Sequence, residues 1–272
     1  MKEVYDMKVQ DKGRIKAYEE LEFKDDFMFG KVMQDSELCR AVLECLLQRP
    51  VGELQEVEPQ REFRYTSDGK PIRMDIYTED SDMVYDAEMQ NLNNKSIESL
   101  YLLKRSRFYQ SSIDTDHMNK TQSYKTMPDS TILFICTFDP FGKGFSRYNF
   151  VSRCEEDLSV ALNDGAIRIF YNCSYDGEDI PDDLKRLYEY IETGKSESEL
   201  TKRIDAAVGK ARKIEEWRSI YMKEMVLWMD ARDEGREEGR KEEKANTEAE
   251  RKRADEAEAE LAKYKAKFGE LS

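Results

Sequence analysis

Residues Ile72–Gln90, which read IRMDIYTEDSDMVYDAEMQ, contain the pattern that decides the fold. Apolar and polar side chains alternate over Ile72–Tyr77 and again over Met83–Gln90, which is the period of a β-strand. The acidic stretch between them, Glu79–Asp82, is typical of a turn. The segment therefore predicts an antiparallel hairpin of two half-buried strands.

A two-residue loop at Ser81-Asp82 would fix which residues of this hairpin face each other. Asp80 then pairs with Met83, and the same register puts Asp75 directly opposite Glu88. Opposed side chains have Cβ atoms ~4.5–5.5 Å apart, and like charges there repel. Two such carboxylates need a shared proton or a cation. Because neither histidine nor cysteine lies nearby, Mg²⁺ or Mn²⁺ is the expected cation.

The same register places Arg73 opposite Gln90, on the polar side of the hairpin with Asp75 and Glu88. In the alternative interpretation, all four are ordinary solvent-facing groups on an exposed hairpin, because exposed acids are common. The spacing alone leaves both interpretations open. If the acids repel each other, Asp75→Ala is expected to leave the stability of the metal-free protein equal or slightly higher.

The elements around the hairpin predict a mixed α/β domain. A long helix is expected over residues 96–113, with Tyr101, Leu103 and Phe108 among its inner residues. The other expected elements are helices from Asp25 or Asp26, from Ser36 to Arg49-Pro50 and from Pro181 to Gly194, and strands over 58–65, 131–137 and 166–171.

Composition divides the 272 residues into a body and a tail. Charged residues make up 38% of the chain, above the usual ~25%. Residues 204–272 carry 16 Lys+Arg and 18 Asp+Glu, with few large apolar side chains. We expect a polar segment over 1–20, a domain over 21–203 and a charged, coiled-coil-like helical tail over 204–272. Ending the chain after Gly194 is expected to leave a folded body.

An apolar stripe at heptad spacing runs along the first part of this tail, interrupted by Arg218. Its members are Ile204, Ala207, Ala211, Ile214, Tyr221, Met225 and Trp228. The stripe predicts either self-association through the tail or a merely solvated helix.

Several classes of protein are disfavoured by composition. The longest purely apolar run, Ile132–Cys136, is far shorter than the ~20 residues of a membrane helix, so no membrane association is expected. Five cysteines without a C-x-x-C pair disfavour a disulfide scaffold and favour a reducing, cytoplasmic location. A single histidine disfavours zinc hydrolases and zinc deaminases. Carboxylate chemistry remains.

Four motifs give the chain a resemblance to a known family. They are FKDDFMF at Phe23–Phe29, RMDIY at Arg73–Tyr77, YDAEMQ at Tyr85–Gln90 and RSRFYQ at Arg105–Gln110. Together they resemble the Rpn family of recombination-promoting nucleases, or putative transposases, of the PD-(D/E)XK nuclease superfamily. The resemblance implies a restriction-endonuclease-like mixed sheet flanked by helices. It runs from about Glu22 to Gly194.

The resemblance implies a metal-dependent DNA endonuclease. By position, Asp75 and Glu88 would be metal ligands, and Gln90 would take the place of the superfamily's lysine, as is expected within the family. Asp26 would correspond to an extra acidic ligand, although its position also suits a helix N-cap.

The resemblance also implies DNA contacts along the helix after the hairpin, through Arg107, Tyr109 and Gln110, with Arg73 at the site. For Arg107, a salt bridge to an acid of the site is the alternative. Net acidity implies weak, transient, salt-sensitive DNA binding. A second hypothesis of a different class is a degenerate nuclease fold that acts as an interaction module through its helical tail.

Overall fold

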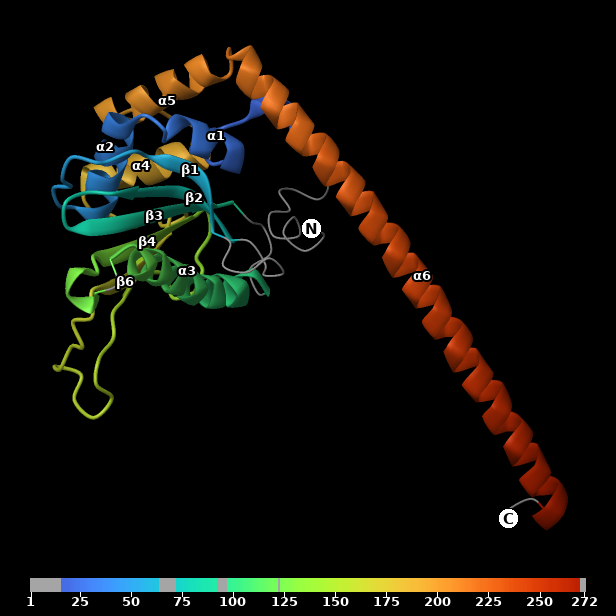
Figure 1. The fold of residues 1–272 in the computed structure, drawn as a ribbon. Coiled ribbons are helices and arrows are strands. Elements are labelled where there is room, and N and C mark those ends of the chain that lie inside the picture. Colours follow the sequence, from blue (N-terminus) through green and yellow to red (C-terminus); the bar gives the residue numbers. More distant parts are fainter. Residues whose placement is uncertain (1–15, 64–71, 92–96, 122, 270–272) are drawn as a thin grey trace. The chain divides into compact units, whose positions relative to one another are not determined.

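The computed structural model describes residues 16–63, 72–91, 97–121 and 123–269. Two helices come first, a sheet with one crossing helix follows, and three helices end the chain (Figure 1). The helices are α1 (Asp26–Val32), α2 (Ser36–Leu47), α3 (Ile97–Thr121), α4 (Asp182–Thr193), α5 (Glu199–Ala211) and α6 (Glu215–Phe268). The strands are β1 (Glu58–Phe63), β2 (Ile72–Glu79), β3 (Met83–Gln90), β4 (Asp129–Cys136), β5 (Arg147–Phe150) and β6 (Ala166–Asn172), and single-turn 3₁₀ helices occupy Tyr18–Glu20 and Tyr124–Thr126.

The six strands form one mixed sheet in the order β1-β2-β3-β4-β6-β5. The first three strands are antiparallel, β3, β4 and β6 run parallel, and β5 is antiparallel to β6. Helix α3 makes the crossover that two parallel neighbours require. The predicted mixed α/β class and the five predicted strands are confirmed, whereas β5 was not predicted because it is short and has no clear alternation.

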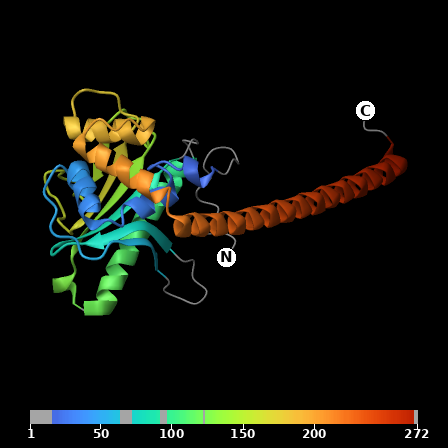
Figure 2. The same cartoon turned by 90° about the horizontal axis from the view of Figure 1, so that it is seen from above.

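Helices cover both faces of the sheet (Figure 1). Helix α3 lies on one face, where Leu102, Tyr109 and Ile113 pack with apolar residues of β2, β3, β4 and β6. Helices α1, α2 and α4 lie on the other face, and α5 crosses over α1 and α2 in the view from above (Figure 2). The central strands are therefore buried on both sides.

This double cover corrects the prediction of half-buried strands. Residues 74–78 of β2 and 84–90 of β3 are all buried. The inner side predicted for the helix after the hairpin is also wrong, since Tyr101 and Phe108 are 60% and 48% exposed. The polar face of the hairpin meets α3 rather than water.

The body of the protein extends beyond the predicted boundary at residue 203. Ile204, Val208 and Ala211 of α5 are buried, and the Tyr18 hydroxyl donates to the Ala211 carbonyl at 2.7 Å. The Tyr221 hydroxyl likewise donates to the Lys16 carbonyl at 2.8 Å. One compact unit accordingly ends at Tyr221, and the remainder of α6 belongs to a second unit.

The predicted heptad stripe is split between two helices. Ile214 N donates to the Ala211 carbonyl, the same oxygen that accepts the Tyr18 hydroxyl. The Arg212 side chain also donates to the Leu21 carbonyl. These contacts end α5 at Ala211, although neither glycine nor proline follows it before α6 begins.

The second unit begins at Met222 and continues as α6. Met222, Val226 and Leu227 are about half exposed, at 52%, 48% and 58%. Self-association through this part of the tail stays a prediction. Among the described helices, none combines the length and the apolar character needed to cross a bilayer.

Two truncations distinguish the body from the extension. Ending the chain after Asp230 should leave the free energy of unfolding nearly unchanged, because the removed residues lie in the second unit. Ending it after Gly194 removes Ile204 and Val208 from the core, which should cost about 3 kcal/mol or more at ~1.5–3 kcal/mol per buried side chain. Urea denaturation measures both, and equal stability of the two truncations would contradict the assignment of α5 to the body.

Candidate active site

The hairpin loop sets the register of β2 and β3 as the sequence predicts. Asp80 N donates to the Met83 carbonyl at 3.0 Å, and the Asp80 carboxylate accepts the backbone amides of Asp82 and Met83. Burial alone would raise the pKa of Asp80, but these and other hydrogen bonds lower it overall. The paired strands run from Glu79 opposite Val84 to Ile76 opposite Ala87, which confirms the predicted register.

Asp75 and Glu88 meet at the end of this ladder. The Asp75 amide donates to Glu88 Oε1 at 2.7 Å, and the Met89 amide donates to Asp75 Oδ2 at 3.1 Å. The two acids are 3% and 0% exposed. Each carboxylate therefore accepts a backbone amide of the neighbouring strand, so the alternative of solvent-facing acids is wrong.

Glu88 also holds a buried ion pair with Arg105 of α3. The distance from Arg105 Nη2 to Glu88 Oε2 is 2.7 Å, and the guanidinium lies 5.2 and 5.4 Å from the ring centres of Tyr109 and Phe134. Burial alone would lower the pKa of Arg105, but interactions with Tyr109, Glu88 and Asp75 raise it overall. The guanidinium thus stays charged and offsets one of the two carboxylate charges, that of Glu88.

Arg105, and not Arg107, is the arginine that reaches the acids. Arg107 is exposed two residues further along α3. The signal for this difference is helical spacing, because Arg105 is three or four residues from Leu102 and Tyr109, both of which are buried. The same spacing relates Arg105 to the predicted inner residues Tyr101 and Phe108, so it favours Arg105 over Arg107 whichever of the two sets faces the sheet.

Gln90 lies two residues beyond Glu88 on β3 and is 1% exposed. Its backbone carbonyl accepts the Thr137 amide at 3.0 Å. Its side-chain oxygen and nitrogen have no hydrogen-bond partner among the residues that the structure describes. A buried amide without partners is costly, by about 1–3 kcal/mol for an unsatisfied group, and calls for an explanation such as a bound ligand or ion.

Asp26 is brought to β2, where it pairs with Arg73. The ion pair between Arg73 Nη2 and Asp26 Oδ2 measures 3.6 Å, and both side chains are partly exposed. Asp26 is the first residue of α1 and not its N-cap. Asp25 holds the N-cap position, but its carboxylate accepts Lys16 Nζ and the Glu22 amide.

Tyr109 and Gln110, predicted to contact DNA, have structural partners. Tyr109 is 4% exposed, and its hydroxyl donates to the Arg73 carbonyl at 3.2 Å. Gln110 Nε2 donates to Ser130 Oγ at 2.6 Å. Ser130 lies four residues, about 13 Å, before the β4 partner of Glu88. Both side chains therefore help α3 to pack on the sheet, and Gln110 does so away from the acid pair.

The donor chemistry of the acid pair fits a hard cation. Asp75 and Glu88 supply carboxylate oxygens, and the Gln90 side-chain oxygen has no partner; oxygen donors of this kind suit Mg²⁺ or Mn²⁺. In the part of the chain that the structure describes, no group of three or more His, Cys, Asp or Glu side chains could hold a metal. Because Glu88 Oε2 already accepts a hydrogen bond from Arg105 Nη2, a cation bound at Glu88 would compete with Arg105.

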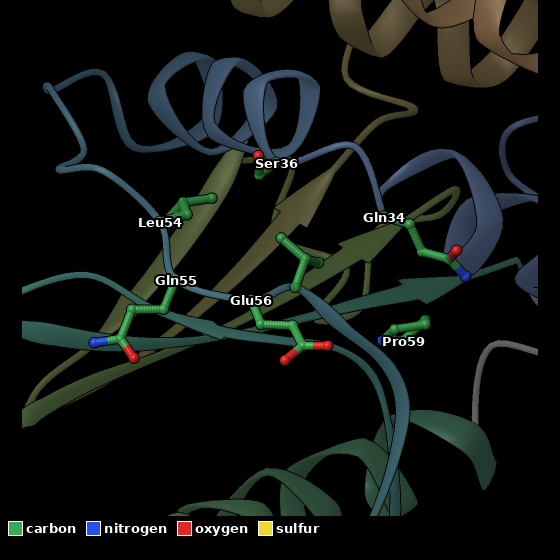
Figure 3. Close-up of a pocket in the computed structure, with 7 residues that line it drawn as sticks. Gln34, Ser36, Leu54, Gln55, Glu56 and Pro59 are labelled. Carbon is green, nitrogen blue, oxygen red and sulfur yellow. The ribbon is translucent and has the colours of Figure 1, made fainter.

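One open pocket of the structure is lined by residues other than the predicted site residues. The open pocket in Figure 3 lies between the start of α2 and the segment that leads into β1. Glu56 is the titratable residue among those that line it, and none of the predicted site residues takes part. The lining residues are Gln34, Ser36, Leu54, Gln55, Glu56, Val57 and Pro59.

His117 forms a second buried polar contact under α3, which the sequence did not suggest. Its Nε2 lies 3.0 Å from the Tyr77 hydroxyl oxygen and 3.6 Å from Glu79 Oε2. Burial lowers the pKa of His117 overall, although the Glu79 carboxylate works in the opposite direction. A lone histidine in a sequence gives no signal for such a contact.

Arg105→Met should destabilise the protein by about 3–5 kcal/mol, because it leaves Glu88 buried without a counter-charge. Arg107→Met on the exposed side of α3 should change stability by no more than ~0.5 kcal/mol. Adding Glu88→Gln to Arg105→Met should recover part of the loss. Urea unfolding of the single and double variants measures the coupling, and additive effects would contradict the ion pair.

The lowered pKa of His117 predicts the sign of a pH effect. The unfolded state, with an ordinary histidine pKa of about 6.5, binds the proton more readily than the folded state. Stability from this group is full above about pH 6.5 and falls as the pH drops through that value. His117→Gln should flatten the dependence of unfolding free energy on pH below about 6.5; an unchanged slope there would contradict it.

No family model, curated protein or solved structure matches this chain. The family resemblance thus stays a prediction from four motifs. A function can be assigned from the chemistry of four buried side chains, those of Asp75, Glu88, Gln90 and Arg105.

Proposed function

We propose that this chain is a Mg²⁺- or Mn²⁺-dependent DNA endonuclease of the recombination-nuclease type. One observation carries the proposal: Asp75 and Glu88 form a buried, hydrogen-bonded pair, and the Gln90 amide beside them lacks any partner. Such a group is expensive to maintain in a core, and a role in binding a ligand would account for it.

Asp75 and Glu88 are the carboxylates assigned to hold the cation, with the Gln90 oxygen as a further donor. Their positions are fixed by the backbone amides of Asp75 and Met89, so little reorganisation of the carboxylates is needed. When bound, the cation lowers the pKa of a water molecule and polarises the scissile phosphate. Asp26 is left out of this set, because it forms an ion pair with Arg73.

Gln90 takes the place of the superfamily's lysine, and Arg105 is the cation beside the acids. Glutamine can only donate and accept hydrogen bonds, so it can orient a water or a phosphate oxygen but cannot neutralise charge. Arg105 carries a permanent charge beside Glu88. We assign Gln90 to orienting the reacting groups and Arg105 to positioning Glu88.

DNA is the proposed substrate because the segment nearest the acids is basic. Residues 99–113 contain Lys104, Arg105 and Arg107 and not one acidic residue, in a chain with a net charge of −14. Cleavage of the phosphodiester backbone by recombination-type nucleases is also what the four motifs imply. A mobile-element role with strand transfer would need chemistry beyond cutting.

The second candidate is a nuclease-like fold without catalysis that serves as an interaction module. The Arg105–Glu88 pair favours it, because the guanidinium already neutralises Glu88 and both carboxylates have protein partners. In this function the tail would bind the partner. The two candidates differ in whether the acid pair takes up a divalent cation.

Asp75→Asn should abolish metal-dependent nicking of supercoiled plasmid, because it removes a ligand charge but keeps an acceptor for the Met89 amide. For Asp75→Ala, the hydrogen bond from the Met89 amide reverses the expectation from the sequence: without metal this variant should be less stable than the wild type, because it removes the acceptor. Asp82→Asn in the exposed hairpin loop is the matched control and should cut like the wild type. Nicking is measured in Mg²⁺, Mn²⁺ and EDTA.

Thermal melting with and without Mn²⁺ gives a readout independent of cutting. The cation should raise Tm for the wild type and not for Asp75→Asn. Cutting by Asp75→Asn, or cutting in EDTA, would overturn the site. Absence of both cutting and a metal-dependent Tm shift in the wild type would favour the interaction module.

A further inference from the structure

Helix α3 has an unusual distribution of side chains between its two sides. It buries Arg105, Ser106 and Ser112 against the sheet, while it exposes Tyr101 and Phe108. Helices of globular proteins ordinarily do the reverse. Exposed aromatic side chains that are grouped on one side of an element are typical of a binding surface.

Two cations lie between these aromatic residues. Tyr101, Lys104 and Phe108 follow the three- and four-residue spacing of one helix side, and Arg107 lies one turn from Lys104. Both cations are exposed, and neither has an ion-pair partner in the part of the chain that the structure describes. We call Tyr101, Lys104, Arg107 and Phe108 the outer α3 face.

The charge of this face differs from that of the whole chain. The chain has 58 acidic and 44 basic residues, but residues 99–113 contain no acid. Arg105 forms an ion pair with Glu88 inside the fold, so Lys104 and Arg107 are the cations of this segment that can bind an external anion. Charge complementarity therefore favours a polyanion as the occupant of the outer α3 face.

We propose that the outer α3 face binds single-stranded nucleic acid, with bases stacked on Tyr101 and Phe108 and phosphates held by Lys104 and Arg107. Stacking needs unpaired bases, whereas phosphate contacts alone would not require exposed rings. Tyr101 and Phe108 are seven residues, about 10 Å, apart along the helix. That is the length of about three nucleotide steps at ~3.4 Å.

This proposal rests on the proposed function in one respect, namely that the ligand is a nucleic acid. Tyr101 and Phe108 flank Arg105 by one helical turn, but their side chains are exposed whereas Arg105 is buried. Binding at the outer α3 face therefore uses none of the side chains of the acid pair and requires neither a divalent cation nor cutting. It would hold a displaced strand while the acids act elsewhere. Binding measured in EDTA therefore tests the face separately from the nuclease.

Fluorescence anisotropy of the full chain with a labelled oligothymidylate in EDTA tests the face. Tyr101→Ala with Phe108→Ala should weaken binding by about 10-fold or more, given ~1–3 kcal/mol per stacked base. Tyr124→Ala with Phe145→Ala, an aromatic pair elsewhere that is even more exposed at 83% and 61%, is the control and should bind like the wild type.

Salt dependence tests the cations. Lys104→Ala with Arg107→Ala should lower the slope of log Kd against log salt by about 1.4, at ~0.7 per phosphate contact on a single strand. Lys202→Ala with Arg203→Ala, two exposed cations of α5, should leave the slope unchanged. Plasmid nicking by each variant shows whether the acid pair still functions.

Equal binding by the aromatic pair variant and the wild type would overturn the proposal, as would tighter binding to duplex of the same sequence. No binding by a wild type that cuts plasmid would overturn the outer α3 face and leave the nuclease standing. Light scattering adds a last check: loss of self-association in Tyr101→Ala with Phe108→Ala, without loss of DNA binding, would make the face a protein contact and overturn the proposal.

Discussion

The buried ion pair between Arg105 and Glu88 determines how the rest of the site is arranged. A charged group in a core must be paired, because an unpaired one costs several kcal/mol. Arg105 therefore faces the sheet, which limits how far α3 can rotate about its axis, and the packing of Leu102, Tyr109 and Ile113 in the core selects the observed rotation. Leu102 and Tyr109 then pack inward, and Tyr101 and Phe108 are left outside.

The same pair decides what the acids can do. Asp75 and Glu88 are held by backbone amides and by one guanidinium in surroundings that exclude water, where charges interact strongly. A divalent cation would have to share Glu88 with Arg105. The Gln90 amide, unsatisfied beside them, is the group that most clearly calls for a ligand. In a catalytic role, Glu88 has to bind a cation beside Arg105, whereas in a purely structural role the ion pair between Arg105 and Glu88 stays closed.

Local rules were enough for the hairpin. A two-residue loop and a period of two give the register of β2 and β3, and both are properties of nearby residues. The α4 helix is similar, since Gly194 ends it in the left-handed conformation that glycine favours, with φ of 77°. The predicted pairing of Asp75 with Glu88 followed from that register, and the structure brings the two together.

The sequence by itself determined the mixed α/β class, the hairpin register, the acid pair and the charged character of the tail. Only the tertiary structure decided which side of α3 faces the sheet, because Tyr101 and Phe108 define a helical stripe as regular as that of Leu102 and Tyr109. It also decided that α5 belongs to the body, through the hydrogen bond from Tyr18 to Ala211. Local periodicity specifies where a side chain can point, whereas its burial depends on partners far away in the chain, such as Glu88 for Arg105.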